Sequence, residues 1–365
     1  MENEELSGQP VPEQTEKKSA GNRILGILGR IGATLLTVVL LLAVALYGVM
    51  FVLAKGPSTT ARDLFVRSVQ ETSAVGFLAR LYFSQEEIDR ITGADAVMEY
   101  QEMDTSLIDL PEQVTPNKEG PVADAWGLVD EDGDGIILET VKGETYSGFM
   151  MVVLDPSRVV MGSKPGSYGV RGYTVEQMVR EFDAVAGTNA GGFEDPNGTG
   201  NGSIPDTMVV VDGRIYNADK GCREGFAGFD SNHILHVGKF SAADVRAKGI
   251  QNGVSFGPVL VVNGHAVDES ILNSGVNPRT AIGQRSDGAV LLLVIDGRQV
   301  TSLGASYKDL AEVFLSYGAV NACNLDGGSS SLMWFEGSYI NTCASVLGIR
   351  PVPTTFLVLK EGADE

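Results

Sequence analysis

The 365-residue sequence is poor in the residues that most often bind metals or act as nucleophiles, with three cysteines and three histidines. Cys222, Cys323 and Cys343 show no CxxC spacing, which argues against a zinc site, and we expect no bound metal there. Cys323 and Cys343 could form one disulfide outside the cell, and three free thiols are the alternative. The scarce histidines count against a Ser-His-Asp hydrolase, and no GxSxG motif, Walker loop or dinucleotide fingerprint is present.

Positive charge is also scarce. The chain has 27 Lys and Arg residues against 47 Asp and Glu, a net charge of −20. This balance disfavours nucleic acid and anionic lipid surfaces as partners, because both are polyanions. It does not exclude a single phosphate group that is bound by backbone N–H groups.

One acidic stretch has the start of a calcium loop. The sequence "DEDGDGIILE" at 130–139 places Asp130, Asp132 and Asp134 in the register of such a loop. The twelfth position, which should be a bidentate Glu, is Val141, and an apolar run follows Gly135. The pattern therefore favours an acidic hairpin turn, and a weak calcium site at the three aspartates is the alternative.

Charged residues are absent from the 24 positions of residues 31–54. As a helix this run would be about 36 Å long, enough to cross a hydrocarbon core of ~30 Å. It is longer than the core of a signal peptide and lacks a good cleavage site. We therefore predict a single-pass membrane anchor. A modest basic bias before the span predicts that residues 1–30 are cytoplasmic and that the chain after residue 54 is outside the cell.

Glycine, in contrast, is abundant: the 45 glycines are about 12% of the chain, against a usual ~7%. Residues 1–20 are polar and are predicted to be disordered. We predict that residues 55–121 form a membrane-proximal helical stalk and a linker. The first part of this region has helical patterns, and the second part is acidic and contains prolines. Residues 122–365 predict one α+β domain, with helices at 174–186 and 306–318 and no regular βα alternation.

The strands of this domain are predicted from short apolar runs, several of which end in Asp-Gly or Asn-Gly, a strong hairpin signal. The clearest runs are "MMVVLDPSRVVMG", "TMVVVDGRIYN", "GPVLVVNGHAV", "AVLLLVIDGRQV" and "PTTFLVLK".

Three turns rich in small residues carry the candidate ligands: 187–195, 277–288 and 324–331. Glycines let a backbone approach a ligand closely, successive N–H groups bind anions, and an arginine adds a bidentate clamp. Asp326 lies among these donors and could act as acid, base or nucleophile. Taken singly, each turn is better explained as an ordinary hairpin turn. The candidate substrate-binding residues are Asn189, Gly192, Arg279, Thr280, Asn324, Gly327, Gly328, Ser329 and Ser330.

Together these turns resemble the phosphodiester glycosidase family, whose bacterial members are often exopolysaccharide-related envelope proteins. The matching stretches are "NAGGF", "FGPVLVVNG", "RTAIG", "VIDGR", "GAVNACNLDGGSSSLM" and "RPVPTTFLVL", in the family's order between residues 189 and 359. Ser329 stands where the family usually has a third glycine.

The resemblance implies an extracytoplasmic hydrolase, anchored by one helix, that cleaves sugar-1-phosphodiester bonds in envelope or exopolysaccharide glycans without a cofactor. It implies that Asp326 lies beside the glycosyl–phosphate bond, where a carboxylate stabilises an oxocarbenium-like state, and that Arg279 grips the phosphate. The second carboxylate stays open among Glu194, Asp195 and Asp296. A non-catalytic module that binds anionic glycans is one alternative. A scaffold that acts through the membrane helix and stalk is another.

Overall fold

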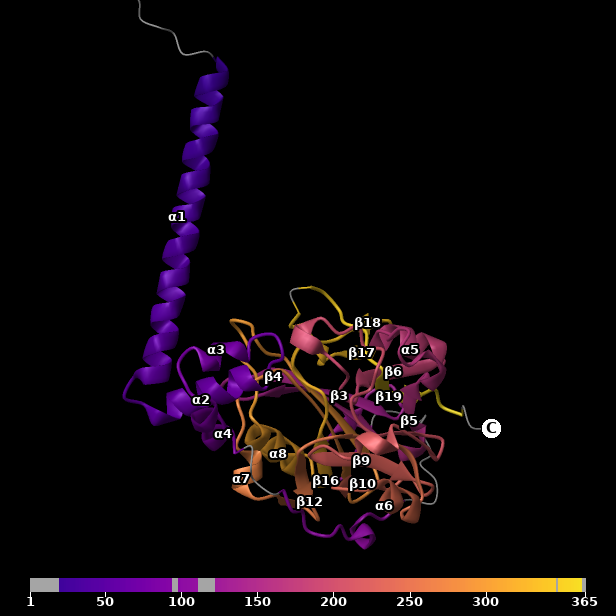
Figure 1. The fold of residues 1–365 in the computed structure, drawn as a ribbon. Helices are drawn as coiled ribbons and strands as arrows, with labels where there is room; N and C mark the ends of the chain where they lie inside the picture. Colours follow the sequence, from indigo (N-terminus) through magenta and orange to yellow (C-terminus); the bar gives the residue numbers. More distant parts are fainter. Residues whose placement is uncertain (1–19, 94–97, 111–121, 346, 363–365) are drawn as a thin grey trace, which may run out of the picture. The chain divides into compact units, whose positions relative to one another are not determined.

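The computed structural model of this chain describes residues 20–93, 98–110, 122–345 and 347–362. All but the last of the residues predicted to be disordered, 1–20, lie outside this part. The chain divides into two compact units, Met1–Ser58 and Thr59–Glu365. The described part of the first unit is mainly one helix, α1 (Ala20–Lys55) (Figure 1). Its stretch Ile24–Lys55 is long and apolar enough to cross a membrane, as are many anchors and signal sequences.

Within the described residues, the second unit contains three larger antiparallel sheets and a small two-stranded sheet, which confirms the predicted α+β class. The seven-stranded sheet has the order β13-β12-β16-β14-β15-β4-β3. Its strands are β3 (Ile136–Lys142), β4 (Ser147–Val153), β12 (Val259–Val262), β13 (His265–Ala266), β14 (Arg279–Arg285), β15 (Val290–Ile295) and β16 (Ala319–Asn324).

Two five-stranded sheets complete the unit. One has the order β18-β17-β6-β19-β5, with β5 (Val159–Ser163), β6 (Ala184–Asn189), β17 (Met333–Phe335), β18 (Ser338–Tyr339) and β19 (Thr354–Leu359). The other has the order β10-β9-β11-β7-β8, with β7 (Val209–Val211), β8 (Arg214–Tyr216), β9 (Gly225–Asp230), β10 (Leu235–Gly238) and β11 (Ile250–Phe256). The small sheet pairs β1 (Val122–Ala123) with β2 (Val129–Asp130).

A core shared by all three large sheets holds the unit together. The position of strand β15 between two cores explains why its sequence is apolar throughout. Leu292 and Val294 face this shared core, whereas Leu291 and Leu293 face a second core that includes helix α8 (Tyr307–Ser316). A strand buried on both faces needs a continuous apolar run instead of an alternating one. Because the core fixes the strand ends, it also fixes the turns that follow them.

Two shorter helices pack on the five-stranded sheets: α5 (Val175–Glu181) on the β6 sheet and α6 (Ala242–Ala247) on the β9 sheet (Figure 1). The helix predicted at 306–318 is confirmed as α8. The helix predicted at 174–186 is wrong in its second half, because residues from Ala184 onward form β6. Asp183 has a positive φ of 51°, which ends the helical path although the apolar pattern continues.

Two of the predicted hairpins form. Asp212-Gly213 joins β7 to β8 and Asn263-Gly264 joins β12 to β13, with positive φ at all four turn residues, as a type I′ turn requires. The Asp296-Gly297 hairpin prediction is wrong. Strand β15 already pairs with β14 on one side and β4 on the other, so no edge is left for a returning strand.

The region predicted as a stalk contributes α2 (Thr59–Gln70), α3 (Phe77–Arg80) and α4 (Gln85–Thr92) to the second unit. The end of α2 contacts the loop before β14. Ser68 Oγ accepts the Val276 N–H at 3.0 Å, and the Glu71 carboxylate accepts the Gly275 N–H and an Arg279 N–H, both at 2.7 Å. The Arg279 side chain is only 4% exposed. These helices are therefore tied to the sheets by an ion pair whose arginine is buried.

We predict that Glu71→Gln destabilises the chain by about 3 kcal/mol, because it leaves the buried Arg279 cation without its counter-charge. Urea unfolding of the chain in detergent measures this change. Glu86→Gln, at an exposed position on α4, is the matched control and should have little effect. Equal unfolding midpoints for the two variants would contradict the role assigned to the pair.

Candidate active site

The three predicted turns meet because β6 and β16 end, and β14 begins, on the same side of the unit. Asn189, at the end of β6, connects them. Its Nδ2 donates to the Asp326 carbonyl at 2.6 Å, and its Oδ1 accepts the Thr280 hydroxyl at 2.8 Å and the Leu332 N–H at 3.2 Å. Asn189 and Thr280 are fully buried and do not line the pocket described next. They hold the turns in place from behind.

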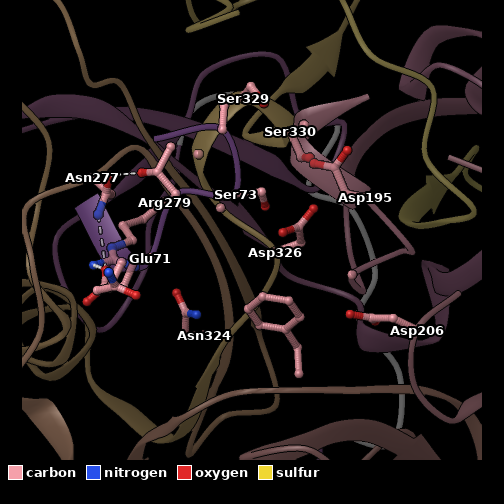
Figure 2. Close-up of a pocket in the computed structure, with 18 of the residues that line it drawn as sticks. Glu71, Ser73, Asp195, Asp206, Asn277, Arg279, Asn324, Asp326, Ser329 and Ser330 are labelled. Atoms are coloured by element: carbon pink, nitrogen blue, oxygen red, sulfur yellow. Dashed lines mark hydrogen bonds and ion pairs between the residues drawn. The ribbon is translucent and has the colours of Figure 1, made fainter. Parts of the chain in front are cut away.

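A pocket of about 1310 Å³ opens beside these turns (Figure 2). It exceeds the ~300–1,000 Å³ of most small-ligand sites, so an extended substrate would fit. One wall comes from the region of α2 to α4, including Glu71 and Ser73. Other walls come from residues 192–195, 198–200, 206, 223–224, 324, 326–330, 344–345 and 347–351. The predicted substrate-binding residues that line it are Gly192, Arg279, Asn324, Gly327, Gly328, Ser329 and Ser330.

Asp326 places its carboxyl group in this pocket (Figure 2). Its backbone N–H donates to the Ala190 carbonyl at 2.8 Å. Loss of solvation, with a smaller contribution from the negative charge of Asp206, raises the pKa of the Asp326 carboxyl to about 7, although the Ser330 hydroxyl and the Arg350 charge act to lower it. A carboxyl group that titrates near neutral pH inside a pocket is a candidate for proton transfer.

The three carboxylates predicted as its partner already have partners of their own. Glu194 lines the pocket but is half-exposed and forms an ion pair with Lys220 at 2.9 Å. Asp195 forms a bidentate pair with Arg350, at 2.6 and 2.9 Å. Asp296 accepts the Thr342 N–H at 2.9 Å and lies outside the pocket lining. The geometry therefore favours Asp326 over Glu194 and Asp296.

Two carboxyl groups in the pocket were missed by the sequence analysis. Glu224 lies directly before β9. Burial raises the pKa of its carboxyl group. No residue in the described part of the chain donates a hydrogen bond to the oxygens of this carboxyl group. Asp206 has a buried Oδ1 without a partner in that part, while its Oδ2 lies 3.4 Å from Arg223 Nη1. Neither residue belongs to a recognisable motif. For Glu224 the available signal was a charged residue directly before an apolar strand.

Arg279, predicted to grip a phosphate, already uses most of its donors within the protein. Its Nε donates to the Ala305 carbonyl at 3.0 Å, and its Nη2 donates to Glu71 and to the Gly275 carbonyl, both at 2.7 Å. The guanidinium also lies over the Tyr307 ring, 4.2 Å from the ring centroid. Arg279 therefore has a structural position in the pocket wall.

The acidic turn has the form of an Asx-type loop. Asp130 accepts N–H bonds from Gly133 and Gly135, and Asp134 accepts one from Ile136. Ligand atoms of Asp130, Asp132 and Asp134 lie within 4.8 Å of one another, a spacing at which carboxylates can share a cation. The backbone bonds explain the cluster without an ion, and calcium binding here stays a hypothesis.

All three cysteines are free thiols.

The family resemblance is confirmed by comparison with known proteins. The sequence profile described as phosphodiester glycosidase matches residues 182–359. These residues belong to the phosphodiester glycosidase family. The matched region contains the Asn189 junction, Glu224, Arg279 and the Asp326 turn, which together form most of the site.

Two curated proteins are similar in sequence to part of this chain. The SPbeta prophage-derived uncharacterized protein YomE of Bacillus subtilis (strain 168) is 33% identical over 178 residues, 46% of this chain and 27% of that protein. The N-acetylglucosamine-1-phosphodiester alpha-N-acetylglucosaminidase of Homo sapiens is 26% identical over 219 residues, 54% of this chain and 41% of the human protein. The chain thus spans less than half the length of these curated relatives.

A solved structure supports the fold. The zebrafish N-acetylglucosamine-1-phosphodiester alpha-N-acetylglucosaminidase catalytic domain, auto-inhibited by its pro-peptide, aligns with a TM-score of 0.52 at 20% identity. The alignment covers 62% of this chain and 82% of the zebrafish chain. The family's sheet arrangement therefore extends beyond the region matched by the profile.

The raised pKa of Asp326 predicts a pH-dependent stability effect. In the unfolded chain this carboxyl titrates near ~3.9, and in the folded chain at about 7. The folded state therefore binds the extra proton between these values, and its stability falls as pH rises from about 4 to about 7. Asp326→Asn removes the desolvated charge, so the melting temperature of the variant minus that of the parent should grow from pH 5 to pH 8.

Asp219→Asn, at an exposed position, is the matched control and should show no such trend. Thermal melts at the two pH values provide the measurement. A constant difference between the Asp326→Asn variant and the parent would show that this carboxyl group is not desolvated.

Proposed function

We propose that this protein is a membrane-anchored, extracytoplasmic glycosidase that hydrolyses sugar-1-phosphodiester bonds in envelope or exopolysaccharide glycans. The observation that carries the proposal is the Asp326 carboxyl group, with its pKa raised to about 7, at the start of the Gly-Gly-Ser-Ser turn of a family domain. The similarity to N-acetylglucosamine-1-phosphodiester alpha-N-acetylglucosaminidases supports the reaction class.

The turn after Asp326 suits the phosphate of such a substrate. The Gly328 N–H donates to the Pro278 carbonyl at 2.8 Å and the Ser330 N–H to the Gly327 carbonyl at 3.2 Å. In the described part of the chain the N–H groups of Gly327 and Ser329 have no protein acceptor, and both residues line the pocket, so we assign these two N–H groups to the phosphate oxygens. Such exposed backbone N–H groups bind anions without any net positive charge on the domain, which fits a chain of net charge −20.

Acceptors for the sugar lie in the same pocket. Asn324 Nδ2 donates to the Gly257 carbonyl at 2.7 Å, whereas its buried Oδ1 has no donor in the described part of the chain. A sugar hydroxyl is a donor that would satisfy this oxygen. Glu224 offers a further unpaired acceptor. The pocket therefore combines donors for a phosphodiester with acceptors for a sugar.

In the proposed reaction the bond between C1 of the sugar and the phosphate oxygen breaks, and its electron pair leaves with the phosphate. The water oxygen forms the new bond to C1, and a carboxylate takes the water proton. Ionised Asp326 stabilises the positive charge that develops on the sugar, as carboxylates do in glycosidases. We assign Glu224 as the second carboxyl group, because it is desolvated and unpaired in the same pocket. Phosphate is a good leaving group and needs no strong acid.

Substitution of the two carboxyl groups tests this assignment. Asp326→Asn and Glu224→Gln should each keep the fold and lower kcat on a sugar-1-phosphodiester at least ~100-fold, the lower end of acid–base contributions. Asp219→Asn is the control for loss of one carboxylate and should keep the parent rate. A parent chain that binds the diester without cleaving it would instead support a non-catalytic glycan-binding module.

The membrane position makes a separate prediction. The apolar stretch Ile24–Lys55 should remain on the mature protein and place the second unit outside the cell. Protease added to intact cells should then remove the C-terminal unit, and carbonate washing should leave the chain in the membrane fraction. A mature chain that begins after Lys55 would show that the helix is a cleaved signal sequence.

A further inference from the structure

Arg298 reaches the pocket from the loop that follows β15. Its backbone has a positive φ of 58°, and its N–H donates to the Leu303 carbonyl at 3.1 Å. Positive φ is uncommon for residues other than glycine, and such backbone strain is often found at functional sites. The chain therefore places a large cationic side chain at a position whose backbone would suit glycine.

The guanidinium of Arg298 lies against the turn that follows Asp326. A Cβ atom added to Gly328 would lie 3.3 Å from Arg298 Nη2 and 3.7 Å from its Nη1. The same Nη2 donates to Thr72 Oγ1 at 2.8 Å and to Asn277 Oδ1 at 3.2 Å. Gly328 thus permits the cation to approach the turn whose N–H groups are available to an anion.

Arg298 also differs from its neighbours in charge compensation. Arg279 is paired with Glu71 and Arg350 with Asp195. Arg298 forms no ion pair within the described residues, and its oxygen partners are neutral. Desolvation and the nearby Arg279 charge lower the pKa of the Arg298 guanidinium, as expected for a cation without a counter-charge. The residue is nevertheless partly accessible, so an incoming anion can reach it.

We infer that Arg298, together with the N–H groups of Gly327 and Ser329, forms the subsite for the phosphate group, and that Arg279 supports the pocket wall. As a refinement of the substrate site this inference rests on the proposed function. The planar fork of an arginine suits two phosphate oxygens at once. The family resemblance pointed to Arg279, the first residue of β14, whereas Arg298 comes from the loop after β15.

Phosphate binding tests the subsite independently of turnover. Isothermal titration of the full chain in detergent with inorganic phosphate compares the parent with Arg298→Gln and Arg298→Lys. Arg298→Gln should bind phosphate at least ~10-fold more weakly, and Arg298→Lys should lie between it and the parent. Arg246→Gln, on the exposed face of α6, removes the same charge elsewhere and should bind phosphate as the parent does.

Arg298→Gly separates binding from folding. Glycine adopts positive φ without strain, so this variant should melt at or above the parent temperature and still lose phosphate affinity. Equal phosphate affinity of the parent and Arg298→Gln, or a parent that binds no phosphate, would overturn the inference. If phosphate binding depends on Arg298 but the parent cleaves no sugar-1-phosphodiester, the proposed function fails and the subsite stands.

Discussion

The site depends on one buried side-chain amide. Asn189 bonds to the backbone of Asp326 and Leu332 and to the Thr280 hydroxyl, so it joins the ends of three strands from two sheets. These groups are buried, where an unmade hydrogen bond costs about 1–3 kcal/mol. The junction therefore fixes the backbone on both sides of the Gly-Gly-Ser-Ser turn. The carboxyl group of Asp326 can then be held at a desolvated position that the turn alone would not maintain.

An acidic chain can still bind an anion, because the relevant charges are local. At the pocket, two of the arginines are neutralised by Glu71 and Asp195, and backbone N–H groups add partial positive charge without a net charge. Glu224 and Asp206 contribute opposing negative charge nearby. A pocket that holds both donors and carboxyl groups suits the proposed substrate, an anionic phosphodiester joined to a neutral sugar. The net charge of the surface affects which substrates approach the protein, whereas the groups in the pocket determine which substrates bind.

The sequence predicted the parts of the site that lie next to buried strands. Asp326 and its turn follow β16 directly, and apolar runs mark such positions clearly. It did not predict Glu224, Asp206 or Arg298. Glu224 directly precedes β9, but only tertiary packing shows that these three residues reach the same pocket. The Asp296-Gly297 pair has the hairpin signal of Asn263-Gly264, yet its strand has neighbours on both sides. Likewise, the helices before the domain have ordinary amphipathic patterns, and tertiary contacts such as the Glu71–Arg279 pair show that they form a pocket wall.

The central claim is that this pocket cleaves the bond between the sugar and the phosphate oxygen. Hydrolysis of a sugar-1-phosphodiester in water enriched in oxygen-18 tests it directly, with mass spectrometry of both products. Cleavage at the sugar carbon, as the account predicts, places the label in the sugar and leaves the released phosphate monoester unlabelled. Label in the phosphate product would show attack at phosphorus, and the protein would then be a phosphodiesterase instead of a glycosidase.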